Sequence, residues 1–147
     1  IGMASSALPG ASPLVRIGDV PYADGGVADS IPVRRAFAKG CDRVFIIRTR
    51  RLEYRMKPSK QAKLIARLNR RYPAFVQALY DRPQKYNQTL SYICEREIEG
   101  TALCLYPEME EVSRMEKDYQ TLMRFYAHGY DQAKAIYPEL RDFMRGK

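Results

Sequence analysis

The segment YADGGVADS, residues 22–30, places an aspartate directly before two glycines. Asp-Gly is a common turn dipeptide, because Asp bonds its own backbone and Gly tolerates unusual backbone angles. Two successive glycines also let the backbone approach another group closely, which a simple turn does not require. A carboxylate held at such a corner could take a proton from a hydroxyl nucleophile. Asp24 is therefore a candidate general base as well as a candidate turn residue.

The residues around this corner predict alternating strands and helices. Residues 20–23 are expected to be extended, Pro32 fits the first position of a helix, and Gly40 fits its end. The apolar run RVFIIRT, residues 43–49, is typical of a buried parallel strand. Residues 20–49 therefore predict a right-handed strand-helix-strand crossover, with Asp24 just past its first strand. Ligand sites in open α/β sheets collect at that end of the strands.

The remainder of the chain is predicted to be mainly helical. Apolar spacing predicts helices over residues 59–71, 73–80 and 84–99, and a strand over residues 101–106. Ser113 and Glu116 form a capping box before a further helix. The apolar residues of that helix recur at helical intervals and are Met115, Tyr119, Leu122, Met123, Tyr126 and Tyr130. Pro138 is expected to interrupt this helix or to begin a last short one.

Composition indicates a chain that can bury a core but cannot span a membrane. It has 147 residues, 46% of them hydrophobic, and no apolar run approaches the roughly 18 residues of a membrane-spanning helix. Cys41, Cys94 and Cys104 are odd in number and lack metal-ligand spacing. We therefore expect no disulfide framework, no metal site and no cofactor, and a reducing, cytoplasmic location. Residues 1–15 do not resemble the start of a domain, so we expect the chain to be part of a longer protein.

Positive charge is concentrated in the middle of the sequence. Residues 31–71 contain 14 Lys and Arg against 2 Asp and Glu, within a net charge of +8. The basic residues 34–71 could form a solvated face, bring the protein to the surface of an anionic membrane, or bind nucleic acid. In the nucleic-acid alternative, residues 48–72 would bind the nucleic acid, with Tyr54 and Tyr72 stacking on its bases. Because no nucleic-acid motif is present, this alternative is the less favoured one.

Two stretches together resemble a known enzyme family. ASSALPG at 4–10 and YADGGVADSIPVRRAFAKGCDRVFIIRTR at 22–50 closely resemble the C-terminal part of the catalytic domain of bacterial patatin-like phospholipases. The resemblance implies a partial three-layer α/β fold over residues 1–50, followed by a mainly helical region over residues 51–147 with one further strand candidate. It also implies a lipid acyl hydrolase, acting on phospholipid or another acyl ester, that uses a Ser-Asp dyad. Asp24 matches the dyad aspartate, Gly25 and Gly26 complete the motif, and Ala4 to Pro9 match a wall of small residues.

The serine that such a dyad requires is not evident. GASPL, with Ser12, imitates a G-x-S-x-G elbow, but Pro13 has no N–H to donate to an oxyanion and Leu14 replaces the last glycine. Ser5 and Ser6 lack elbow glycines altogether. We therefore expect the nucleophile and the oxyanion hole to lie N-terminal to residue 1, and residues 1–147 alone to be inactive.

Other polar residues are expected to have ordinary roles. His128 lies off the apolar stripe of its helix and is expected to be solvated. The same is expected of the acidic residues Glu95, Glu97, Glu99, Glu108, Glu110 and Glu111, whose spacing spreads them around a helix. A noncatalytic interaction domain is the remaining alternative.

Overall fold

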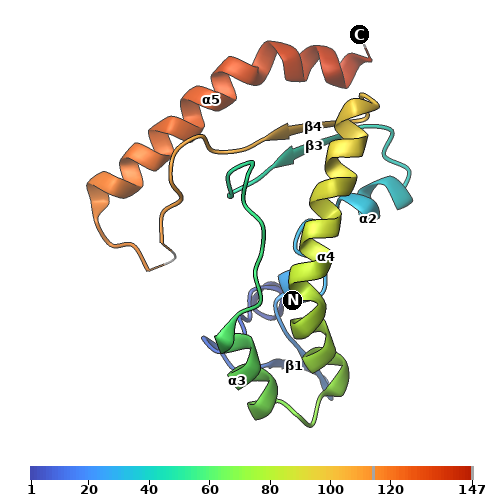
Figure 1. Cartoon of the computed structure of the whole chain (residues 1–147), viewed down its shortest axis with the longest axis vertical. Coiled ribbons are helices and arrows are strands. Elements are labelled where there is room, and N and C mark those ends of the chain that lie inside the picture. The colour runs from blue at the N-terminus through green and yellow to red at the C-terminus, as the bar shows by residue number, and fades with distance from the viewer. Residues whose placement is uncertain (114, 147) are drawn as a thin grey trace. The chain divides into compact units, whose positions relative to one another are not determined.

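The computed structural model, which describes residues 1–113 and 115–146, is mixed α/β, as expected at the level of the α/β class (Figure 1). The chain forms two compact units. Unit 1 comprises Ile1–Pro32 and Arg55–Leu90, and unit 2 comprises Val33–Tyr54 and the residues from Ser91 onward. Each unit contains one two-stranded sheet.

Unit 1 is built around a β-hairpin and the helices that follow it. Its elements are α1 (Gly2–Ser5), β1 (Val15–Ile17), β2 (Val20–Tyr22), the 3-10 helix η1 (Gly25–Val27), α3 (Lys60–Leu68) and the first part of α4 (Pro73–Ile98). β1 and β2 pair antiparallel, with Ile17 opposite Val20. The two-residue turn between them begins at Gly18, whose φ of +59° suits glycine. The core of unit 1 consists of Ala4, Ala7, Val27, Ala66, Leu79, Tyr86 and Leu90.

Unit 2 contains a parallel pair of strands. Its elements are α2 (Val33–Ala38), β3 (Val44–Ile47), the end of α4, β4 (Ala102–Leu105) and α5 (Tyr119–Arg145). Val44 lies opposite Ala102 and Ile47 opposite Leu105. The strands predicted over 43–49 and 101–106 are thus confirmed. Gly40 and Gly100, at φ of +89° and +70°, follow α2 and α4 as predicted.

The crossover predicted over residues 20–49 is wrong. β2 pairs with β1, whereas β3 pairs with β4 in a different sheet. The tight turn at Gly18 places β1 within reach of β2 after only two residues, and such a local pairing costs little chain entropy. Sequence patterns identified the extended segment at residues 20–23 but neither its partner β1 nor the separate sheet of β3.

Proline residues do not end the two long helices. Residues 73–80 and 84–99 were predicted as separate helices, but α4 is one continuous helix (Figure 1), and Pro83 lies inside it. α5 likewise continues through Pro138 to Arg145, so the predicted interruption is wrong. A proline removes one intrahelical hydrogen bond. In α4 the helical turns on both sides of Pro83 are stabilised by buried side chains, namely Leu79, Tyr86, Leu90 and Ile93. Packing therefore outweighs the local preference there.

The start of α5 also differs from the prediction. Asp118 caps the helix, because its Oδ2 accepts the Thr121 hydroxyl at 2.6 Å and the Thr121 N–H at 2.8 Å, and these hydrogen bonds lower the pKa of its carboxyl. Ser113 and Glu116 instead accept nearby N–H groups in the preceding turns. The predicted apolar stripe is exposed, with Tyr126 64% and Tyr130 52% accessible.

Among the described residues, no helix has the length and apolarity that crossing a bilayer requires.

Burial separates the three cysteines. Cys104 on β4 is buried, whereas Cys41 and Cys94 are exposed. Burial, with a smaller effect of the Glu97 carboxylate, raises the pKa of the Cys104 thiol to about 11. We expect iodoacetamide at pH 8 to modify Cys41 and Cys94 about a hundredfold faster than Cys104, because the thiolate is the reactive form. Peptide mass mapping over time measures the rates. In urea the three rates should converge, whereas equal rates in the native protein would contradict the burial of β4.

Candidate active-site loop

The loop after β2 holds the Asp24 carboxylate in a fixed position. Asp24 is the N-cap of η1, and its Oδ1 accepts the Gly26 N–H at 2.6 Å. Its side chain is half-buried. The Asp24 N–H donates to the Ala7 carbonyl at 3.0 Å, so the loop is bound to the buried small-residue segment that contains Ala4 and Ala7. The structure thus brings together the two stretches that carry the family resemblance.

The two glycines of the loop are not equivalent. Neither has a positive φ, so backbone angles alone do not explain them. A Cβ at Gly26 would stand 2.9 Å from Asp24 Oδ1, closer than real Cβ atoms approach other groups. At Gly25 nothing lies within 4 Å of that position. Gly26 is therefore required for close approach of the carboxylate, and Gly25 is not.

A serine and an arginine support the loop from the other side. Ser30 Oγ donates to the Gly26 carbonyl at 2.6 Å and accepts from Arg82 Nε at 3.4 Å. Arg82 Nη2 lies 3.8 Å from the point where a Gly26 Cβ would stand. Arg82 belongs to α4, more than fifty residues after the loop in the sequence. Sequence reasoning missed it, since a single arginine before a helix proline carries no distinguishing signal.

The serines rejected on sequence grounds do not reach the carboxylate. Ser6 Oγ donates to the Gly2 carbonyl at 2.8 Å, and Ser12 Oγ to the Leu8 carbonyl at 3.4 Å. The Ser5 side chain is exposed. Ser30 donates its hydroxyl hydrogen to the Gly26 carbonyl instead. In the part of the chain that the structure describes, no serine hydroxyl hydrogen-bonds to Asp24.

Some residues expected to be solvated are instead packed. His128 Nε2 accepts the Glu108 N–H at 3.1 Å, so the histidine holds a loop. Glu111, with a side chain only 22% exposed, pairs with Arg50 and accepts the Arg51 N–H at 3.1 Å. Burial raises the pKa of Glu97. The solvated assignment is wrong for these three residues, because contacts between segments that are separated in the sequence are invisible in local spacing.

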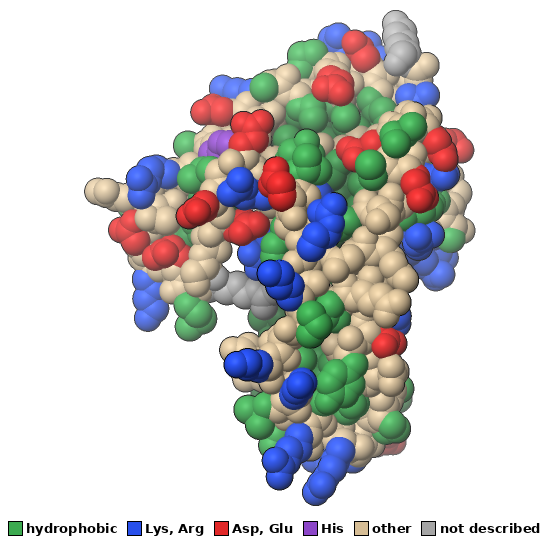
Figure 2. All heavy atoms as spheres, viewed as in Figure 1, with side chains coloured by type: hydrophobic (Ala, Val, Ile, Leu, Met, Phe, Trp, Pro, Cys, Tyr) green, Lys and Arg blue, Asp and Glu red, His purple; other side chains and the backbone are tan. Residues whose placement is uncertain are grey.

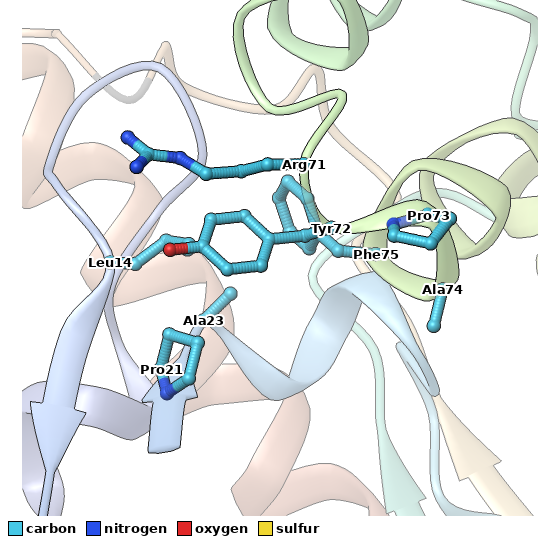
Figure 3. A pocket seen from close by; sticks show the side chains of 8 residues that line it. All are labelled: Leu14, Pro21, Ala23, Arg71, Tyr72, Pro73, Ala74 and Phe75. Carbon is cyan, nitrogen blue, oxygen red and sulfur yellow. The ribbon is translucent and has the colours of Figure 1, made fainter. Parts of the chain in front are cut away.

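An apolar pocket is lined in part by Ala23, the residue directly before Asp24. It encloses about 380 Å³ and is lined by Leu14, Pro21, Ala23, Arg71, Tyr72, Pro73, Ala74 and Phe75. Figure 3 shows the Tyr72 ring between the Arg71 side chain and Ala23 with Pro21. Arg71 lies over that ring, 5.5 Å from its centroid. Because Ala23 directly precedes Asp24, the chain that lines the pocket continues into the Asp24 loop.

The difference between the glycines is directly testable. Gly26→Ala should displace the Asp24 carboxylate and lower the free energy of unfolding by about 1–2 kcal/mol, the usual cost of losing an N-cap. Gly25→Ala, the matched control, should change it by less than about 0.5 kcal/mol. Urea unfolding followed by circular dichroism measures both values. Equal effects of the two substitutions would mean that the Asp24 cap does not stabilise the loop.

Comparison with known proteins places part of the chain in a family. A family model described as "Domain of unknown function (DUF6363)" matches residues 72–145, which span α4, β4 and α5. The match covers half of the chain and leaves the Asp24 loop outside it. Searches of curated proteins and of solved structures found no match. The chain therefore belongs to the DUF6363 family, whose function is unknown.

Proposed function

We propose that this chain carries the aspartate of a patatin-like Ser-Asp lipid acyl hydrolase. The observation that supports this most is the hydrogen bond from the Gly26 N–H to Asp24 Oδ1. It fixes one carboxylate oxygen and orients the other. Among the described residues Oδ2 has no hydrogen-bond partner, so it can accept a proton from a hydroxyl.

The proposed reaction needs a serine from a segment that precedes residue 1 in a longer protein. Its hydroxyl gives its proton to Asp24 Oδ2 while its oxygen attacks the ester carbonyl. The tetrahedral intermediate then collapses, and the leaving alcohol takes the proton. Water, deprotonated by the same carboxylate, then attacks the acyl-enzyme. As the bond between the serine oxygen and the acyl group breaks, Asp24 returns the proton to the serine oxygen and the fatty acid is released. No histidine is required for either half of this reaction.

The parallel pair in unit 2 supports the proposed partial three-layer fold. Parallel strands are ordinarily covered on both faces within larger sheets. Here the pair has only two strands, and Ile47 on β3 is 69% exposed. An exposed branched residue on a parallel strand is explained if the sheet is extended and covered by further strands and helices of a longer protein.

The pocket beside the loop suits the acyl part of an ester. Its lining is apolar except for Arg71 and the Tyr72 hydroxyl. A hydrocarbon chain in this space would displace water from apolar surface, and Arg71 could pair with a phosphate near its edge. The substrate class that we propose is therefore an acyl ester with an anionic group.

The base assignment is tested in the longer native protein with its upstream segment. Asp24→Asn keeps the side-chain size but removes the base, so kcat for p-nitrophenyl butyrate should fall at least about a hundredfold. Asp29→Asn changes an exposed aspartate in the same segment. This control should stay within about twofold of the unsubstituted protein. Undiminished hydrolysis by Asp24→Asn would defeat the assignment, and an unsubstituted protein without hydrolysis would favour a noncatalytic interaction domain.

A further inference from the structure

The structure divides the basic segment 34–71 into packed and exposed parts. In unit 2 several arginines are committed to structural contacts. Arg34 lies 3.8 Å from the centroid of the Tyr92 ring, and Arg43 donates to the Phe143 carbonyl. Arg48 is buried at 8% exposure and donates to the Arg51 carbonyl at 2.9 Å. The segment is therefore not one uniform binding surface.

The cations of α3 have a different environment. Lys60, Lys63 and Arg67 are exposed, and none of them forms an ion pair with a described residue. Residues 54–80 contain seven Lys and Arg and no Asp or Glu. Figure 2 shows Lys and Arg side chains gathered around α3, at the lower end of the view, with hydrophobic side chains beside them. This part of unit 1 is a concentrated, uncompensated positive surface.

Two leucines lie among these cations. Leu64 is 61% exposed and Leu68 is 72% exposed, although both belong to an amphipathic helix. They are four residues apart and so adjacent on one face. Ala66, on the opposite side of α3, is buried, and the Ile65 side chain between these two sides is packed, since its Cδ1 lies 3.1 Å from the point where a Gly10 Cβ would stand. The leucines therefore have no partner within unit 1.

We propose that α3 docks on an anionic lipid bilayer. Leu64 and Leu68 enter the interface, and Lys60, Lys63 and Arg67 contact headgroup phosphates. α3 is already ordered for this contact, because Ser59 caps it by accepting the Gln61 N–H at 3.1 Å. The docking deepens the proposed function by placing the hydrolase at its substrate. It does not require an active Asp24.

A nucleic-acid partner fits this surface less well. Phosphates would pair with the cations but would leave both leucines in water. The candidate stacking residues are also occupied, since Arg50 lies 4.9 Å from the Tyr54 ring centroid and Arg71 covers Tyr72. A bilayer interface satisfies the charged and the apolar groups together.

Vesicle sedimentation of the full 147-residue chain tests the proposal. The protein should bind vesicles of phosphatidylserine and phosphatidylcholine, bind pure phosphatidylcholine much less, and lose binding as salt rises. The charge reversal Lys60→Glu, Lys63→Glu, Arg67→Glu should weaken binding at least about a hundredfold. Leu64→Ala with Leu68→Ala should weaken it about tenfold or more, because apolar insertion is lost. Asp24→Asn should bind like the unsubstituted chain, which separates docking from hydrolysis.

Matched controls alter exposed residues elsewhere. Arg35→Glu, Lys39→Glu, Lys117→Glu changes the net charge by the same amount, and Ile98→Ala with Met144→Ala removes exposed apolar groups. Both controls should bind several-fold more tightly than the corresponding α3 variants. Absence of binding to phosphatidylserine vesicles would overturn the proposal, as would undiminished binding by the leucine variant. Duplex DNA binding that is lost on charge reversal but kept by the leucine variant would also overturn it, in favour of nucleic acid.

Discussion

The hydrogen bond between the Gly26 N–H and Asp24 Oδ1 is the constraint on which the candidate site depends. It makes Asp24 a turn-forming residue, and that does not compete with a role as a base. A carboxylate has two oxygens, and a cap uses one of them. The same bond that stabilises η1 therefore directs Oδ2. Because the Asp24 N–H is bound to Ala7, the position of the carboxylate is set by backbone on both sides.

Local chemistry allowed much of the fold to be predicted, and longer-range packing explains the failures. Gly40 and Gly100 identify element ends because only glycine adopts their φ readily. The pairing of residues 20–23 was mispredicted, because a strand's partner depends on the whole chain. Pro83 and Pro138 misled for a related reason: the local penalty of proline is real, but the flanking turns remain helical. Propensity determines where an element is favoured, and tertiary contacts decide where it ends.

The candidate site follows the same division. Asp24 and Gly26 could be identified from the sequence, because their interaction spans two residues. Arg82 and the Ser30 contact could not, because α4 brings them together from distant parts of the chain. Glu111 shows the converse error. Its spacing in the sequence predicted a solvated side chain, but in the structure it forms an ion pair with Arg50. Residues close in the sequence therefore reveal the contacts within the loop. The residues that support the loop from distant parts of the chain are found only from the three-dimensional structure.

Net charge alone would have given a misleading picture of this protein's surface. In unit 2, Arg43 and Arg48 are shielded from solvent at least in part and donate to backbone carbonyls, so their charge is part of the packing. In α3, the side chains of Lys60, Lys63 and Arg67 have neither an acidic partner nor an aromatic ring over them among the described residues. α5 also exposes apolar side chains, Tyr126 and Tyr130 among them, but acidic residues such as Asp131 accompany its cations. An exposed apolar face indicates a partner of definite charge only where the surrounding charges have one sign, and α3 meets that condition.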